Sequence, residues 1–359
     1  MNALSRFLRV EFRPPNFLLL PTAGIDISTS GIKVALISET MRGYKLASYG
    51  ELMLPVGSVV GGEIADRKAV IKGLRTLAKK HHIQMANVAL PESRGYLFQA
   101  PVPKDISRDG ARVHIEQRLE EYVPLPAPEV VFDFVRVQDG EKQTRAIGMG
   151  YSRRVIDETI SVVEEAGIMV RAVESETFAL PRAVLQREST DTVLLVDIGK
   201  TTTKLMVISD QVPRYVTTLP IGGHALTLAV TKYFGVSEEE AKKVKAERGI
   251  VPDKENEEYL AAMISTVSVI KDEILTRVEY WKNHAKEEGG DIARALLVGG
   301  NAAIKGLPEY LQEALSVPVS LGDTFTNLIP RKVSKTPLSE MESLAYGTAI
   351  GLALRTYES

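Results

Sequence analysis

The chain has 359 residues, of which 44% are hydrophobic and 25% charged, so it can bury a sizeable core and form roughly two or three domains. A formal net charge of −2 argues against binding nucleic acid through bulk charge, and the lack of cysteine excludes disulfides and thiolate metal sites. The five histidines show no metal-ligand spacing. These properties fit an intracellular protein that does not act on nucleic acid.

Residues 1–23 are expected to form an N-terminal arm, which prolines interrupt. Charged residues break up its apolar run, so it is neither a signal peptide nor long enough to span a bilayer. Leu4, Phe7 and Leu8 would share one face of a helix, with two arginines elsewhere. The arm could pack on the body of the protein, or it could dock on a membrane surface or a partner.

Residues 24–94 alternate strand and helix patterns. Strands are predicted at 24–28, 33–39, in "YKLASYGELMLP" and in "NVALP", and the spacing of apolar residues in "DRKAVIKGLRTLAKKHH" predicts a helix. We expect this α/β unit to resume at 173–190.

Residues 95–172 change character and are predicted to form an inserted subdomain. The segment "GYLFQAPVP" is typical of a strand, and a helix is predicted in "SRDGARVHIEQRLEEYV". Two strands follow around the turn "QDGEKQ", and then come the helix "RRVIDETISVVEEAG" and the strand "IMVRAVE". The order β-α-β-β-α-β predicts a small two-layer module.

The second half of the body spans 191–223 and 291–359, around a mostly helical stretch at 224–290. "DTVLLVDIGKTTTKLMVI" predicts strand, turn and strand, and "RALLVGGNAAIKGLPEYLQEAL" predicts strand, glycine turn and helix.

A repeated motif links the two halves. "DISTSGIKVALI" begins at Asp26 and "DIGKTTTKLMVI" at Asp197, and each has a lysine seven positions after the aspartate. Small residues let backbone amides in such a turn approach phosphate, and an aspartate beside phosphate can hold hydrated Mg²⁺. Lys33 would add positive charge, whereas Lys204 could contact phosphate or face solvent. The repeat predicts a duplicated α/β body with one phosphate-binding hairpin in each half.

The segments "GIDISTSGIK", "VDIGKTTTK", "VGGNAAIKGL" and "SLAYGTAIG" resemble the two phosphate motifs, the adenosine motif and a connecting motif of the actin, Hsp70 and sugar kinase superfamily. The resemblance implies an actin-like ATPase fold, made of duplicated ribonuclease H-like domains, that binds ATP and Mg²⁺ across a cleft.

The resemblance also implies site residues. Asp26 and Asp197 would contact Mg²⁺ through water, the alternative being carboxylates that cap turns. The remaining residues expected to bind the nucleotide are Ser28, Thr29, Ser30, Gly31, Lys33, Gly199, Thr201, Thr202, Lys245, Gly299, Gly300 and Asn301. Lys242 stands where relatives carry an acidic ribose partner, which departs from the pattern.

Glu174 and Glu176, in "VESETFALPRA", resemble the segment that orients water for hydrolysis in bacterial actins. Glu174 is the better positional match, so it is the expected catalytic residue. The alternative is an acidic residue favoured by a helix N-terminus. Any ATPase activity is expected to be slow.

The insertion at 95–172 is placed as in FtsA and PilM, and "IEQRLEEYVPLPAPEVVFDF" is similar to the PilM pattern. The chain is therefore identified as a member of the PilM family of type IV pilus assembly proteins, in which the insertion would be the SHS2-like subdomain. FtsA-like proteins typically continue into a membrane-targeting helix, and this chain shows none.

That family implies a cytoplasmic ATP-binding scaffold at the inner membrane, which binds the N-terminal peptide of a PilN-like protein. Membrane association would be indirect, and contacts with pilus motor or platform proteins and a dimer stay open. The alternatives are an FtsA-like protein that tethers filaments to the membrane and a small-molecule kinase of the same superfamily, for which the sequence shows no convincing acceptor motif.

Overall fold

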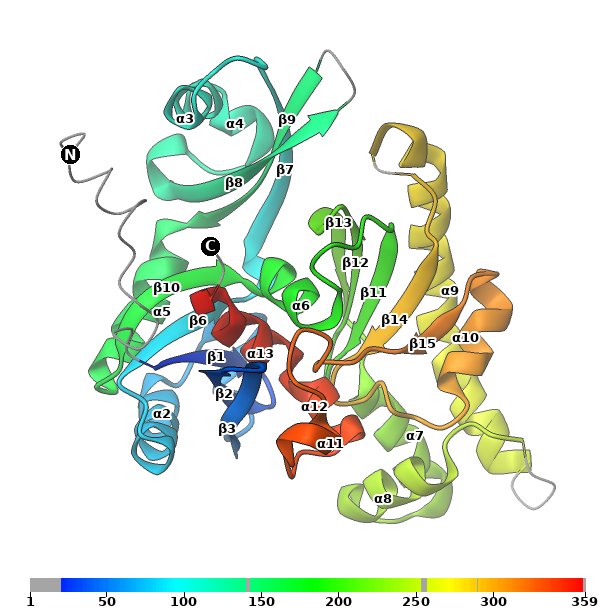
Figure 1. Cartoon of the computed structure of the whole chain (residues 1–359). Coiled ribbons are helices and arrows are strands. Elements are labelled where there is room, and N and C mark those ends of the chain that lie inside the picture. The colour runs from blue at the N-terminus through cyan, green and yellow to red at the C-terminus, as the bar shows by residue number, and fades with distance from the viewer. Residues whose placement is uncertain (1–20, 140–142, 253–256, 289, 358–359) are drawn as a thin grey trace.

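The computed structural model describes residues 21–139, 143–252, 257–288 and 290–357. Its body consists of two five-stranded sheets, which lie side by side in Figure 1. The first contains β1 (Thr22–Ser28), β2 (Gly31–Thr40), β3 (Gly43–Met53), β6 (Met85–Leu90) and β10 (Met169–Ser175). The second contains β11 (Val193–Ile198), β12 (Thr203–Ser209), β13 (Val212–Leu219), β14 (Arg294–Val298) and β15 (Val319–Leu321).

The two sheets have the same topology. Their strand orders are β3-β2-β1-β6-β10 and β13-β12-β11-β14-β15, with an antiparallel hairpin at the same place in each. In the first hairpin Asp26 lies opposite Lys33 on the neighbouring strand, and in the second Asp197 lies opposite Lys204. The common spacing of seven residues therefore reflects a common register, and the predicted duplication is confirmed.

Two helices, α6 (Glu176–Val184) and α13 (Gly347–Leu354), lie between the sheets (Figure 1). Their apolar side chains share one buried cluster with Ala35 and Ile37 of the first sheet and Leu195 and Met206 of the second. This shared core ties the two halves together.

Glycines allow these layers to approach closely. A Cβ on Gly24 of β1 would lie 1.9 Å from the carbonyl oxygen of Ala349 in α13. A Cβ on Gly351 would lie 1.8 Å from the carbonyl oxygen of Ala179 in α6. Both distances exclude any side chain, so the small residues of "YGTAIG" serve close packing.

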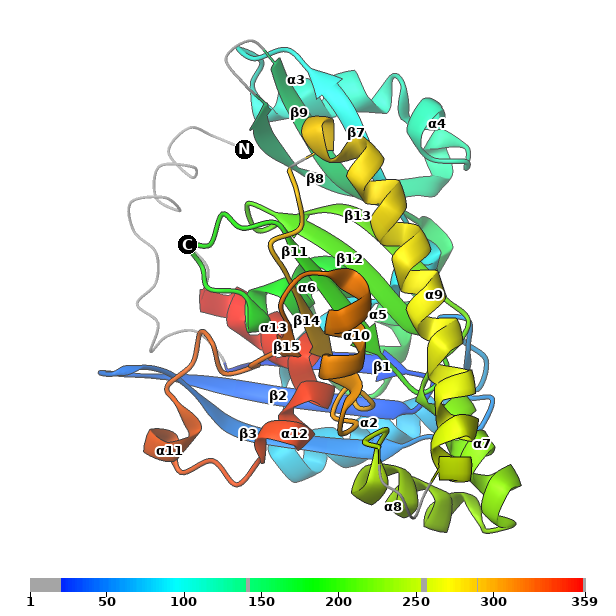
Figure 2. The same cartoon turned by 90° about the vertical axis from the view of Figure 1, so that its right-hand side faces the viewer.

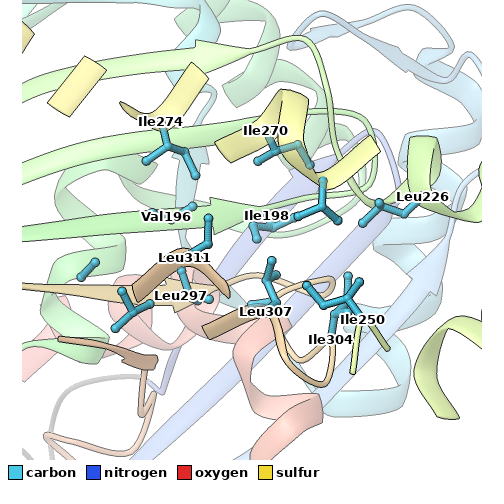
Figure 3. Packing of buried hydrophobic residues seen from close by; sticks show 14 of the residues in the cluster. Val196, Ile198, Leu226, Ile250, Ile270, Ile274, Leu297, Ile304, Leu307 and Leu311 are labelled. Carbon is cyan, nitrogen blue, oxygen red and sulfur yellow. The ribbon is translucent and has the colours of Figure 1, made fainter. Parts of the chain in front are cut away.

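Helices also cover the outer faces. On the first sheet, α2 (Arg67–His81) and α5 (Arg153–Glu165) pack against the sheet residues Ile25, Val34 and Val88. The long α9 (Glu257–Glu288) crosses the second sheet and contributes Ile270 and Ile274 to its outer core (Figures 2 and 3).

The remaining elements are shorter or connect the layers. The α-helices are α7 (Gly223–Phe234), α8 (Glu238–Arg248), α10 (Leu307–Leu315), α11 (Arg331–Ser334) and α12 (Glu340–Ser343). The short strands are β4 (Val59–Val60) and β5 (Glu63–Ile64), and the 3₁₀ helices are η2 (Glu92–Arg94), η3 (Ala127–Glu129), η4 (Leu344–Tyr346) and η5 (Arg355–Tyr357). No helix in the described part of the chain is both long enough and apolar enough to cross a bilayer.

Side-chain caps fix several helix starts. The Asp66 carboxylate accepts a hydrogen bond from the Ala69 amide at the start of α2. Ser237 and Glu240 form a capping box at the start of α8, which satisfies amide groups that the helix leaves unpaired.

The inserted subdomain is smaller than predicted. It comprises α3 (Arg108–Glu116), α4 (Leu119–Tyr122) and a three-stranded sheet of β7 (Gly95–Val102), β9 (Gln143–Ser152) and β8 (Val130–Asp139), in that order. The helix and strand that follow belong to the first half instead, since α5 packs beside α2 and β10 pairs with β6. The prediction of a module ending at residue 172 is thus corrected to an end near Ser152.

Candidate functional site

A cavity of about 350 Å³ lies between the two halves, where the turns of both hairpins converge. Strands β1 and β2 supply one wall, and β11, β12, α7 and α8 supply the other. The predicted residues that line it are Asp26, Ser28, Thr29, Ser30, Lys33, Asp197, Gly199, Thr202, Lys245, Gly299, Gly300 and Asn301.

The two hairpins meet at their tips. The Thr29 and Thr201 hydroxyl groups lie 3.2 Å apart and share a hydrogen bond, although the residues are 172 positions apart in sequence. Thr201 itself is not among the described lining residues, and neither is Gly31. A Cβ on Gly31 would lie 2.3 Å from the Leu52 carbonyl oxygen, at a φ of +151°, so this glycine serves the hairpin backbone. The prediction that the hairpins face each other across one cleft is confirmed.

Carboxylates gather at the bottom of the cleft. Burial raises the pKa of Asp26 to about 6; nearby Lys33 opposes the shift, while Glu176 adds to it. Burial also raises the pKa of Asp197. No group of three or more His, Asp or Glu side chains among the described residues is arranged to hold a metal ion.

The Lys204 side chain is largely buried and forms ion pairs with two carboxylates. Its Nζ lies 2.5 Å from Glu176 Oε2 and 3.9 Å from Asp197 Oδ2. Burial disfavours its charged form, but the attraction of Glu176 and Asp197 outweighs burial and raises the pKa of Lys204. Lys204 is therefore a fixed cation within a carboxylate network.

The position of Glu174 corrects the prediction that it orients water in the cleft. Its carboxylate forms a bidentate ion pair with Arg182, at 2.8 and 2.9 Å, and it is absent from the described lining of the cavity. Glu176, two residues later, does line the cavity. Its Oε1 accepts a hydrogen bond of 2.7 Å from the Glu92 amide, which fixes the side chain.

Lys245 is a buried cation on the wall formed by α7 and α8. Its Nζ donates to the Gly223 carbonyl at 3.0 Å, the Thr227 hydroxyl at 3.1 Å and the Asn301 amide oxygen at 2.9 Å. Burial, with a smaller effect of Lys242, lowers the pKa of Lys245 to about 8. An anion in the cleft would compensate this charge.

The loop at Gly299–Asn301 is held against the second hairpin. Asn301 Nδ2 donates to the Gly199 carbonyl at 3.0 Å. A Cβ on Gly299, which has a φ of +92°, would lie 2.3 Å from Asp197 Oδ1. Only glycine fits there, so the loop and the second aspartate form one unit.

Several residues that line the cavity lie outside the predicted set of site residues. They are Glu51, Met53, Leu180, Lys200, Gly223, His224, Thr227, Leu344, Ala345 and Thr348. His224 and Thr227 both lie in the first turns of α7. The segment "IGGHALT" is the sequence signal that indicates a helix start beside a glycine turn. Glu51 and Met53 come from β3 and carry no motif.

A second cavity, of about 340 Å³, lies between the inserted subdomain and the first half. Strand β8, at the edge of its sheet, provides Phe132, Asp133 and Phe134. The opposite wall includes Phe178 of α6 and the Glu174–Arg182 ion pair. The cavity thus combines apolar side chains with charged groups on both walls, Arg108 and Asp133 on the side of the inserted subdomain and the Glu174–Arg182 pair on the side of the first half.

Sequence comparisons give one family match and low-identity relatives. A family model described as "Type IV pilus assembly protein PilM" matches residues 24–357. The cell division protein FtsA of Streptococcus pneumoniae is 24% identical over 386 aligned positions, covering 91% of this chain and 83% of the relative. FtsA of Borreliella burgdorferi is 25% identical over 226 positions, covering 55% of this chain, which spans about half (51%) of that relative.

Solved structures share the fold. The PilM–PilN type IV pilus biogenesis complex contains a chain that is 21% identical, with a TM-score of 0.78, covering 95% of this chain and 99% of that one. MreB5 of Spiroplasma citri bound to ADP is 14% identical, with a TM-score of 0.52, covering 91% and 94%. These matches confirm an actin-like ATPase fold.

Proposed function

Because the chain belongs to the PilM family of type IV pilus assembly proteins, we propose that it is an ATP-binding scaffold of pilus assembly that binds the N-terminal peptide of a PilN-type membrane protein. The main support for ATP binding is that two equivalent hairpins, joined by a hydrogen bond between Thr29 and Thr201, meet over one cavity.

The residues of the cleft fit a nucleotide with Mg²⁺. Serine and threonine hydroxyls and Lys33 supply donors for phosphate oxygens. Asp26 and Asp197 are carboxylates whose pKa burial raises, so a cation between them and the phosphates would stabilise their charged form. Bound Mg²⁺ would neutralise phosphate charge, and the aspartates would hold it through water.

Hydrolysis, where it occurs, would depend on Glu176 rather than Glu174. Glu176 lines the cleft and could position water, but Lys204 and the Glu92 amide already engage its carboxylate oxygens. A base held by a cation accepts a proton poorly. We therefore propose binding with slow turnover.

The second cavity is our proposed site for the PilN-type peptide. The edge of β8 offers unpaired backbone groups to an extended peptide, and Phe132, Phe134 and Phe178 offer apolar contacts. In the solved complex a protein named PilM assembles with PilN, which supports this assignment. Partnership with PilN would place the chain at the cytoplasmic face of the inner membrane.

The test combines two ligands. Mg²⁺-ATP should raise the melting temperature of the purified chain, and Asp26→Ala should abolish the shift while the protein stays folded. A peptide from the N-terminus of the PilN-type protein of the same organism should bind both proteins, and Phe178→Asp should abolish that binding. A wild-type melting temperature that does not respond to Mg²⁺-ATP would overturn the nucleotide part.

The similarity to FtsA supports one alternative proposal, in which the chain polymerises into filaments. It predicts filaments with ATP on lipid, measured by sedimentation and microscopy. We expect none.

A further inference from the structure

Helix α2 exposes a stripe of positive charge on its outer face. Lys68, Lys72, Arg75 and Lys79 recur at helical spacing and are all exposed, and no acidic residue occurs within the helix. Such a stripe is about 16 Å long. The buried residues Val70, Leu74 and Leu77 occupy the opposite face, so the lysines point away from the first sheet.

Among the described residues, acidic side chains form ion pairs with Arg67, beside the stripe, and with no member of the stripe. Arg67 pairs with Glu158 and Glu165 of α5, and Arg75 donates to the Glu165 carbonyl at 2.7 Å. Within the described ranges of the chain, Lys68, Lys72 and Lys79 have no ion-pair partner. Since the whole chain carries a formal charge of −2, the stripe is a local concentration of charge.

The stripe ends beside further exposed basic and apolar residues, which are typical of a membrane-facing surface. We call this region, around the end of α2 and the start of β6, the rim. Lys80 and His82 are exposed at the end of α2. Three residues later Met85 starts β6, between Thr22 of β1 and Met169 of β10, and Met169 is 58% exposed.

The N-terminal arm joins the described chain at the same rim. Residues 1–20 of the arm lie outside the described residues, and β1 begins at Thr22 instead of the expected residue 24. The sequence of the arm carries Arg6 and Arg9 beside Leu4, Phe7 and Leu8. The start of β1 at Thr22, paired with Met85, fixes its attachment point close to the last turn of α2.

We propose that the α2 stripe, Lys68, Lys72, Arg75 and Lys79, binds the surface of a bilayer that contains anionic phospholipid. A row of exposed lysines on a helix suits a flat, diffuse layer of negative charge. A protein partner would need an apolar contact core, and α2 exposes no large apolar side chain. The proposal goes beyond the proposed function, because it adds a direct lipid contact to the indirect one through a membrane protein.

The experiment is flotation of the full chain with vesicles. Wild type should float with phosphatidylcholine vesicles that contain about 30% phosphatidylglycerol, but not with phosphatidylcholine alone. Binding should weaken between about 0.05 and 0.5 M NaCl, because salt screens exposed charges. The double variant Lys72→Glu/Lys79→Glu should bind at least about tenfold more weakly.

A matched control separates the stripe from total charge. Lys232→Glu/Lys282→Glu makes the same charge change on exposed positions of α7 and α9, and it should float like wild type. Equal loss in both double variants, undiminished binding of the α2 variant, or no binding of wild type to anionic vesicles would each overturn the proposal. The last result would point to an acidic protein as the partner. Melting temperatures and Mg²⁺-ATP shifts of both variants, expected to match wild type, verify folding and keep this test separate from the nucleotide site.

Discussion

At the scale of single residues, the cleft concentrates charge that is not fully compensated within the protein. Asp26 lies near Glu176 and Asp197, and burial raises its pKa to about 6. Lys204 and Lys33 offset part of this repulsion. A ligand that brings a divalent cation would complete the balance, so the free protein carries a cost that serves binding.

Replacing Asp26 tests that cost. In the absence of nucleotide and Mg²⁺, Asp26→Asn should raise the free energy of unfolding at pH 7 by up to about 3 kcal/mol, because it removes a desolvated negative charge. Urea denaturation measures the change. Ser30→Ala, in the turn of the same hairpin, should not be stabilising. A decrease in stability for Asp26→Asn would contradict the interpretation.

Lys245 predicts a pH dependence of nucleotide affinity. Its pKa of about 8 means that the ammonium loses its proton above that pH, whereas a bound anion favours the charged form. Binding would then take up a proton above pH 8, so affinity should fall several-fold between about pH 7 and pH 9. Calorimetric titration measures it.

Lys245→Gln is the control for this dependence. It should bind Mg²⁺-ATP more weakly at pH 7 and lose the decline toward pH 9. An affinity of wild type that stays constant over this range would show that the Lys245 charge does not act on the nucleotide.

The sequence predicts the paired aspartates and lysines well, because hairpin register converts a fixed spacing into fixed neighbours. It does not predict which of Glu174 and Glu176 enters the cleft. Glu174 belongs to β10, which ends at Ser175, and Glu176 starts α6, so a shift of two residues across that junction changes the direction of the side chain. Glu174 instead forms its ion pair with Arg182, which lies near the end of α6 and draws the carboxylate away from the cleft.

At the scale of elements, local sequence patterns predict whether a segment forms a helix or a strand. They predict less well which other elements it packs against. The order of strands and helices in the insertion is as predicted, yet α5 and β10 join the first half. Periodicity marks a buried face but does not identify the layer that buries it. Membership in a sheet follows from pairing with β6, whose nearly continuous buried run is equally compatible with other partners.

Close packing between α6 and α13 gives an element-scale prediction. Gly351→Ala should lower the free energy of unfolding by roughly 3 kcal/mol or more, since the new Cβ would lie 1.8 Å from the Ala179 carbonyl oxygen. Gly300→Ala is the matched control, because its Cβ would meet only the Ala345 side chain, at 3.5 Å. Thermal and urea unfolding compare the two, and equal stabilities would contradict the packing argument.

At the scale of the whole molecule, polar contacts behind the cleft connect the two halves. The Thr218 hydroxyl of β13 donates to the Glu92 carboxylate in the first half, and burial raises the pKa of Glu92. The Glu92 amide in turn donates to Glu176, which holds Lys204 of the second half. The relative position of the halves therefore depends on a small, buried network.

Thr218→Val tests that network. Leaving the buried Glu92 carboxylate without its donor should cost about 1–3 kcal/mol of stability and should open the cleft. Small-angle X-ray scattering without nucleotide should then show a larger radius of gyration. Adding Glu92→Gln to Thr218→Val should recover part of the loss, and an unchanged radius with unchanged stability would contradict the role of the pair.

The insertion of α13 between the sheets has a consequence for synthesis of the chain on the ribosome. Gly24 of β1 packs against Ala349, more than 300 residues later. The part of the inner face of the first sheet that α13 covers therefore stays exposed until nearly all of the polypeptide has been translated. Contacts this distant in sequence slow folding and leave apolar surface open to aggregation in the meantime. A nascent chain stalled before α13 should need chaperone protection that the released chain does not.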